Sequence, residues 1–119
     1  MMIASKHAHV DTEVFEQLRQ LEAIRPGTLA ELTSHFLEDG EAHLQTLESA
    51  VADQLGEVVT AAHSLKGCSG MIGAKELARL SAVVELEGRA GNLSTDHVGQ
   101  LRAAFNAFVP LLRDLANEA

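Results

Sequence analysis

Residues 57–73 read EVVTAAHSLKGCSGMIG, and this stretch determines how the rest of the chain is interpreted. On a helical wheel with about 100° per residue, the apolar and small side chains of this stretch fall on one arc. That arc contains Val58, Ala61, Ala62, Leu65, Cys68, Ser69 and Ile72. His63 lies on the opposite side. The pattern therefore predicts a helix that ends at Gly73, buries one face and exposes His63 near its middle.

The surroundings of His63 on the exposed side are unusual. Gly67 and Gly70 follow it at i+4 and i+7, and glycine within a helix costs about 1 kcal/mol relative to alanine. Lys66, at i+3, can bring an ammonium group close to the imidazole. Taken singly, these residues are a solvated histidine, two packing glycines and a surface lysine. Together they indicate a presented histidine with an open approach and one cation.

Apolar residues also recur at helical spacing on both sides of this stretch, and glycine and proline separate the segments. Asp11 or Thr12 can cap a first short helix, and Thr28 can cap the second. Pro110 lies opposite the apolar stripe of the last helix, where it should kink the helix outward. The expected helices span residues 11–25, 28–55, 57–72, 74–89 and 94 to at least 115.

No segment shows the period-two alternation of a strand. The fold class is therefore all-α, and short connections between long helices predict an antiparallel up-and-down four-helix bundle with a short extra N-terminal helix. We expect residues 1–10 to form a flexible tail and residues 11–119 to form a single domain.

Composition excludes several classes of function. The chain has 119 residues and a formal net charge of -8, which argues against binding nucleic acid or an anionic membrane surface. There is no apolar run that could span a bilayer and no signal-peptide core. The lone Cys68 excludes an internal disulfide and suits a reducing compartment. We therefore expect a small cytoplasmic module.

The segment 62-AHSLKGCS-69, followed by Gly73-Ala74, resembles the signature of histidine phosphotransfer (HPt) domains, four-helix-bundle modules of bacterial hybrid sensor kinases and phosphorelays. The resemblance extends over nearly the whole chain apart from the tail. Residues 11–18 resemble the leading helix of the family, the Leu77, Leu80, Glu85 run resembles the helix after the signature, and residues 101–108 suit its closing helix. Minor departures from the family pattern are Cys68 and Val84.

The resemblance implies that His63 accepts a phosphoryl group from an aspartyl phosphate on a receiver domain and passes it to another receiver Asp. Lys66 would offset the added charge, and Gly67 would admit the receiver. The chain has no Gly-rich phosphate loop, so it would be a phosphocarrier and not an enzyme. No cofactor is expected in this chain, and Mg²⁺ would come from the partner receiver domain.

The expected partners are receiver domains of response regulators and, if the chain is the C-terminal domain of a longer protein, the parent hybrid sensor kinase. We expect a monomer. Candidate docking residues lie around His63, after the signature and on the leading helix: Val59, Gly70, Met71, Lys75, Arg79 and Val14.

Two other classes of function are alternatives to phosphotransfer. A di-metal carboxylate enzyme needs Glu-x-x-His pairs, and no Glu here has a His three residues later. His35, Asp39 and His43 share one helix face, which is best interpreted as solvated. The stronger alternative is an adaptor that docks a response regulator without carrying phosphate.

Overall fold

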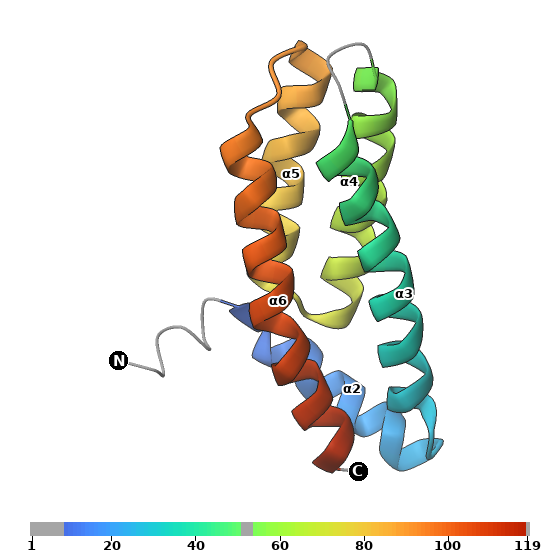
Figure 1. Cartoon of the computed structure of the whole chain (residues 1–119). Coiled ribbons are helices and arrows are strands. Elements are labelled where there is room, and N and C mark those ends of the chain that lie inside the picture. Colours follow the sequence, from blue (N-terminus) through green and yellow to red (C-terminus); the bar gives the residue numbers. More distant parts are fainter. Residues whose placement is uncertain (1–8, 51–53, 119) are drawn as a thin grey trace.

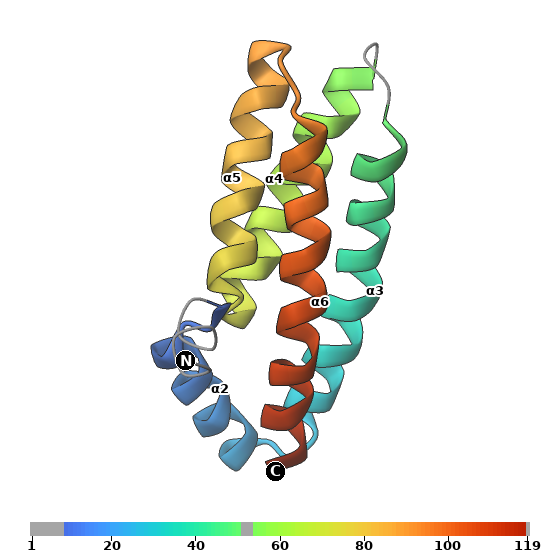
Figure 2. The same cartoon turned by 60° about the vertical axis from the view of Figure 1, so that its left-hand side comes forward.

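The structure, a computed structural model, describes residues 9–50 and 54–118. Its helices are α2 (Thr12–Ile24), α3 (Thr28–Ser49), α4 (Leu55–Ile72), α5 (Lys75–Ala90) and α6 (Thr95–Glu118). The last four lie side by side and alternate in direction, while the short α2 crosses one end of the bundle obliquely (Figures 1 and 2). The predicted all-α, antiparallel four-helix bundle with an extra N-terminal helix is confirmed. Of the helices in these ranges, none is both long enough and apolar enough to cross a membrane.

Asp11 starts α2 as predicted, because its carboxylate accepts the backbone N–H groups of Glu13 and Val14 at 3.1 and 3.3 Å. The predicted flexible tail is too long, however. Val10 is only 3% exposed and pairs with Ala74 in an isolated antiparallel bridge. This short contact joins Val10 to the turn between α4 and α5. The rest of the predicted tail, residues 1–8, lies outside the described residues.

The start of α3 differs from the prediction that Thr28 caps it. Gly27 is the N-cap, with a φ of 96°, and Thr28 is the first helical residue. The carboxylate of Glu22 on α2 accepts the N–H groups of Gly27 and Leu29 at 2.9 and 2.8 Å. A side chain from the preceding helix therefore binds the N-cap N–H and one of the free N–H groups in the first turn of α3, and the Thr28 hydroxyl donates to the carbonyl of Arg25 instead.

The predicted second helix is also too long. It ends at Ser49, because Ala50 has an extended backbone (φ -68°, ψ 142°). Leu55, which continues the apolar stripe in the sequence, belongs to the first turn of α4, and Gly56 lies inside that turn. Val51, which also falls on this stripe in the sequence, lies outside the described residues.

The other ends agree with the prediction. Gly73 and Gly91 close α4 and α5 in the left-handed conformation, with φ values of 84° and 73°. The Ser94 hydroxyl accepts the N–H of His97 at 3.3 Å at the start of α6. Pro110 lies in α6 on the exposed side, while the predicted stripe of α6 is buried.

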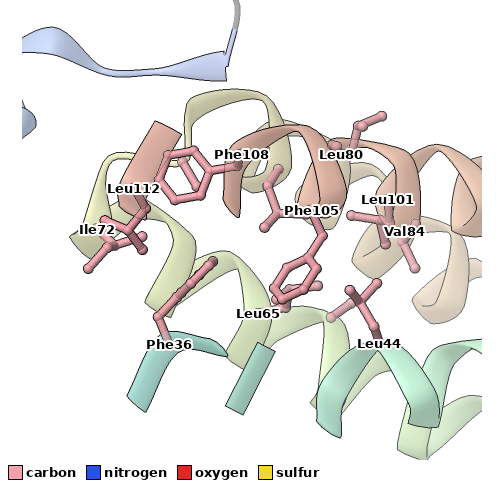
Figure 3. Packing of buried hydrophobic residues seen from close by; sticks show 14 of the residues in the cluster. Phe36, Leu44, Leu65, Ile72, Leu80, Val84, Leu101, Phe105, Phe108 and Leu112 are labelled. Carbon is pink, nitrogen blue, oxygen red and sulfur yellow. The ribbon is translucent and has the colours of Figure 1, made fainter. Parts of the chain in front are cut away.

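All four phenylalanines of the chain meet in one cluster in the core. The ring of Phe36 lies 5.7 Å from that of Phe105 and 5.6 Å from that of Phe108, and Phe15 of α2 lies 5.9 Å from Phe108. Figure 3 shows Phe36, Phe105 and Phe108 in the space between the helices, with aliphatic side chains around them. This cluster joins α2, α3 and α6 and holds the end of the bundle onto which α2 packs.

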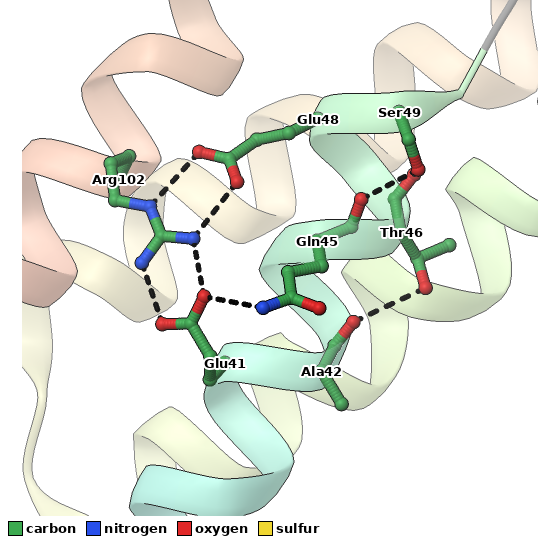
Figure 4. A network of polar contacts seen from close by, with 7 residues as sticks. All are labelled: Glu41, Ala42, Gln45, Thr46, Glu48, Ser49 and Arg102. Carbon is green, nitrogen blue, oxygen red and sulfur yellow. Dashed lines mark hydrogen bonds and ion pairs between the residues drawn. The ribbon is translucent and has the colours of Figure 1, made fainter.

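Next to Phe105, whose ring centroid lies 5.8 Å from the guanidinium carbon of Arg102, a surface ion network joins α3 to α6 (Figure 4). The guanidinium of Arg102 binds both oxygens of Glu41 at 2.7 Å and those of Glu48 at 2.8 and 2.9 Å. Hydrogen bonds from Arg102 and Gln45 lower the pKa of Glu41 to about 2. The long helices α3 and α6 are therefore fastened both through the core and at the surface.

Candidate functional site

His63 lies near the middle of α4, and its side chain is 64% exposed. Its Nδ1 atom lies 2.9 Å from Oε2 of Glu85, which comes from the neighbouring helix α5. The predicted exposure of His63 is confirmed. The sequence did not reveal that one ring nitrogen is held by a carboxylate while the imidazole remains accessible.

Glu85 is the centre of this site. Its side chain is only 7% exposed, yet three groups surround its two oxygens. Lys66 Nζ lies 2.8 Å from Oε1, and Arg89 Nη2 lies 2.8 Å from the same Oε2 that contacts His63. The hydrogen bonds from Lys66, Arg89 and His63 lower the pKa of Glu85 to about 2 against the opposing effect of burial. Glu85 is therefore ionised at neutral pH.

The ionised carboxylate determines which nitrogen of His63 carries the proton. Ionised Glu85 can only accept hydrogen bonds, so the proton of a neutral imidazole resides on Nδ1. The lone pair then resides on Nε2, the nitrogen that does not contact Glu85. When the imidazole is neutral, its Nε2 can therefore act as a nucleophile.

The close approach of α4 and α5 brings these residues together. Gly88 has no side chain, and a Cβ atom there would lie 3.0 Å from Cγ2 of Val59 and 3.1 Å from Cγ1 of Val58. Glu85 precedes Gly88 by about one helical turn, and His63 follows Val59 by about one turn. Gly88 thus lets α5 approach α4 closely enough for the carboxylate to reach the imidazole.

Gly67 and Gly70 differ from the packing glycines. A Cβ atom on either one would meet nothing within 4 Å, whereas a Cβ on Gly40 would lie 2.7 Å from the Phe105 ring. Packing therefore requires glycine at position 40 but not at positions 67 and 70. The two glycines beside His63 leave open surface, as the sequence predicted.

Comparison with known proteins identifies the family to which this chain belongs. The family model described as "Hpt domain" matches residues 31–110. The chain belongs to the Hpt domain family. This Hpt domain therefore acts in histidine phosphotransfer within a phosphorelay, as a phosphocarrier and not a kinase domain, and it interacts with receiver domains.

Solved structures support the same assignment. Histidine-containing phosphotransfer protein B (HptB) from Pseudomonas aeruginosa PAO1 matches with a TM-score of 0.82 and 25% identity, over 93% of this chain and 96% of that chain. A rice protein described as a histidine-containing phosphotransfer protein shares the fold, with a TM-score of 0.61 and 23% identity, over 94% of this chain and 79% of that chain. No curated protein matches the sequence of the chain significantly.

Lys66 of the Hpt domain lies in the site, but its direct partner is not the one we expected. The sequence places its ammonium near the imidazole of His63. In the structure the ammonium contacts Oε1 of Glu85, whose other oxygen contacts His63. The Lys66 side chain is 40% exposed, so its charge faces both the carboxylate and the solvent in front of the site.

The predicted docking residues divide into two groups. Met71 is 79% exposed and Gly70 is open, so both are available to a partner. Val59 is half-buried and packs against α5 near Gly88, so it offers a partner less surface than Met71 does. Val14 is half-buried, and its Cβ would lie 3.3 Å from a Cβ on Gly73, so it mainly supports the turn between α4 and α5.

The two basic residues near the start of α5 do not contact Glu85 or its partners in the part of the chain that the structure describes. Arg79 is exposed and pairs with Glu76 on its own helix at 2.7 Å, a contact that lowers the pKa of Glu76. Lys75 is also exposed. Both can contribute to a rim of positive charge, and neither contacts the residues around His63 in the interactions of the described chain.

An apolar groove of about 340 Å³ lies between α2, α3 and α4. Met71 lies on the edge of the groove and on the same face of α4 as His63 and Gly67. It follows His63 by about two helical turns and Gly67 by about one turn. The exposed apolar side chains of the groove are Leu21 of α2 and Met71 of α4. Its lining residues are Leu18, Leu21, Leu32, His35, Phe36, Asp39, Cys68, Met71 and Ile72.

Cys68, which the sequence places on the core-facing side of α4, is half-buried: it packs against the core and also lines this groove. Burial is the main reason that the pKa of its thiol is raised. His35 and Asp39 line the same groove. In residues 9–50 and 54–118, no group of three or more His, Cys, Asp and Glu side chains is arranged to hold a metal ion.

Sequence reasoning missed Glu85 and Arg89 as site residues. The available signal was an acidic residue on a buried stripe, because Glu85 directly follows the inward-facing Val84. A buried carboxylate requires partners, and a basic residue at i+4, such as Arg89, is one of the simplest. That His63 is another partner follows only from the packing of α5 on α4.

Proposed function

We propose that His63 carries the phosphoryl group in this Hpt domain, taking it from an aspartyl phosphate of one receiver domain and passing it to the Asp of another. The observation that carries this proposal is the hydrogen bond between Nδ1 of exposed His63 and ionised Glu85. That contact keeps the lone pair on Nε2, where a phosphoryl donor can reach it.

In the forward step, the Nε2 lone pair attacks phosphorus and forms the N–P bond. The bond between phosphorus and the aspartyl oxygen breaks, and its electron pair leaves with the aspartate. The ring becomes positively charged while its proton stays on Nδ1, next to the carboxylate of Glu85. Transfer to the second receiver reverses these changes, so Glu85 stabilises the charged ring in both directions.

Lys66 and Gly67 support this step from α4. A phosphoryl group carries between one and two negative charges, and the half-exposed Lys66 can turn from Glu85 toward it. Gly67, one turn from His63, leaves room for the edge of the receiver that carries its Asp. Charge neutralisation and alignment then provide most of the rate enhancement.

The receiver docks over the open face of α4 and the apolar groove beside it. Met71 lines the groove, and a Cβ atom on Gly70, one residue before it, would meet nothing within 4 Å, so both offer surface to the receiver. Lys75 and Arg79 form a basic rim that favours association with an acidic receiver surface. Val14 contributes indirectly by supporting the turn at the end of α4.

Mg²⁺ would be held by the receiver, and there it would offset the charge on the phosphoryl oxygens. The donor set around His63 does not suit Mg²⁺, because the oxygens of Glu85 are already paired with Lys66, Arg89 and His63. We further propose that the domain has no enzymatic activity of its own and works as a cytoplasmic monomer. A hybrid sensor kinase is its expected upstream partner.

Transfer from a phosphorylated receiver domain in the presence of Mg²⁺ tests this proposal. Wild type, His63→Gln and the control His43→Gln are compared by intact mass and by the acid and alkali stability of the label. We expect an acid-labile, alkali-stable label on wild type and on His43→Gln, and none on His63→Gln. A wild type that binds the receiver but is never labelled would instead identify an adaptor.

A further inference from the structure

We propose that Arg89 is a positioning residue for phosphotransfer: it keeps Glu85 ionised and in contact with Nδ1 of His63 while Lys66 binds the phosphoryl group. This inference rests on the proposed function and assigns different tasks to the two cations that contact Glu85.

The contacts at the two oxygens of Glu85 differ. Lys66 contacts Oε1 at 2.8 Å, whereas Arg89 and His63 share Oε2 at 2.8 and 2.9 Å. When Lys66 leaves, Oε1 loses its partner but the contacts at Oε2 persist. The carboxylate oxygen that sets the tautomer of His63 is therefore held by the cation that stays.

The positions of the two cations on the helices favour this division. Lys66 shares α4 with His63 at i+3 and has a flexible side chain, so it can follow a phosphoryl group on Nε2. Arg89 shares α5 with Glu85 at i+4, and its contact lies within one helix. Arg89 is therefore the more constant partner of Glu85.

Loss of both cations would have a specific chemical consequence. Glu85 is 7% exposed, and burial without a cation favours its protonated form. A protonated carboxyl group can donate to Nδ1 of His63, and the ring proton then moves to Nε2. Nε2 would lose the lone pair that attacks phosphorus. One remaining cation is enough to prevent this change.

The test compares wild type, Lys66→Gln, Arg89→Gln and the double variant. The control is Arg19→Gln, because Arg19 is another exposed arginine that bonds a carboxylate one turn away, that of Glu16. Nitrogen-15 NMR of His63 reports its tautomer without requiring phosphorylation. Phosphoramidate, a small donor, then gives the rate of phosphorylation and the phosphorylated protein, in which the exchange of the Nδ1 proton with water is measured.

We expect each single variant to keep the proton on Nδ1 before phosphorylation, and the double variant to lose this preference. After phosphorylation, the Nδ1 proton should exchange at least about tenfold faster in Arg89→Gln than in Lys66→Gln, since a factor of ten corresponds to about 1.4 kcal/mol. Arg19→Gln should match wild type in every measurement.

Equal exchange in the two single variants, or an unchanged tautomer in the double variant, would overturn the role of Arg89. If wild type is not phosphorylated at His63 at all, the proposed function fails. The tautomer of the unphosphorylated double variant still decides whether Arg89 holds Glu85, so the two failures are distinguishable.

Discussion

Gly88 of α5 faces Val59 of α4 so closely that a Cβ atom on Gly88 would lie 3.0 Å from Cγ2 of Val59. This contact sets the distance between the two helices that supply the site. Because Glu85 lies one turn from Gly88, the packing of a residue outside the site determines whether the carboxylate reaches His63.

Gly88→Ala should therefore reduce both stability and phosphorylation. The added methyl group must displace Val58 and Val59, and overpacking of this kind costs about 1–3 kcal/mol. We expect a lower free energy of unfolding in urea and slower labelling of His63 by phosphoramidate. A variant that is destabilised but labelled at the wild-type rate would contradict the link between helix spacing and the site.

Substitutions at Gly67 should separate stability from access. Gly67→Ala places its Cβ in open space, so it should raise the free energy of unfolding by about 0.5–1 kcal/mol. Gly67→Leu should slow transfer from a receiver about tenfold or more, because the side chain occupies the approach to His63, and should leave labelling by phosphoramidate nearly unchanged. An equal loss of phosphorylation rate with the receiver and with phosphoramidate would mean that position 67 affects the reactivity of His63 itself.

Gly40→Ala should have the opposite effect on stability from Gly67→Ala. Its Cβ would lie 2.7 Å from the ring of Phe105, so we expect a loss of about 1–3 kcal/mol in the free energy of unfolding. Thermal and urea unfolding would measure it. An increase in stability would show that the ring moves aside at little cost.

Glu85→Gln should slow phosphorylation of His63 even by a small donor. The substitution removes a charge-assisted hydrogen bond to Nδ1, and such bonds contribute about 1.5–3 kcal/mol. The rate with phosphoramidate should fall about 10- to 100-fold, and NMR should show more of the tautomer with the proton on Nε2. An unchanged rate together with an unchanged tautomer would remove Glu85 from the mechanism.

The stability of the fold should depend on pH in the acid range. The pKa values of Glu41 and Glu85 are lowered to about 2 from 4.5, so their contribution to stability is complete above pH 4.5 and is lost as the pH falls toward 2. Arg102→Gln removes the main cause of the shift at Glu41 and also that at Glu48. The urea midpoint of this variant should vary less than that of wild type between pH 5 and 2.5.

Much of the fold was predictable because it depends on local patterns. The buried arc of α4, the stripe of α6 and the glycines that close α4 and α5 follow from spacing alone. The end of α3 could not be predicted in this way, because the apolar stripe continues from Leu47 to Leu55 although the helix ends before Ala50, which lies between them. Periodicity shows which residues face the core, but two helices that share one stripe look like a single helix.

Of the residues in the site, only those on α4 could be predicted from the sequence. His63, Lys66 and Gly67 form a local pattern on one helix, so their proximity follows from the sequence. Glu85 and Arg89 come from the next helix, and their position depends on the rotation of α5 and its distance from α4. Gly88 sets that distance, and its significance is visible only when the valines it contacts are known.

The contact between His63 and Glu85 joins residues only 22 positions apart, whereas the contacts of Arg102 with Glu48 and Glu41 join residues 54 and 61 positions apart. The reactive cluster is therefore contained in one continuous hairpin, α4 and α5, which can form early in folding because it closes a short loop. We expect partial opening at α2 or at the end of α6 to leave the contact between His63 and Glu85 in place. In hydrogen exchange, the amides around His63 should consequently exchange in a different cooperative unit from those of α2.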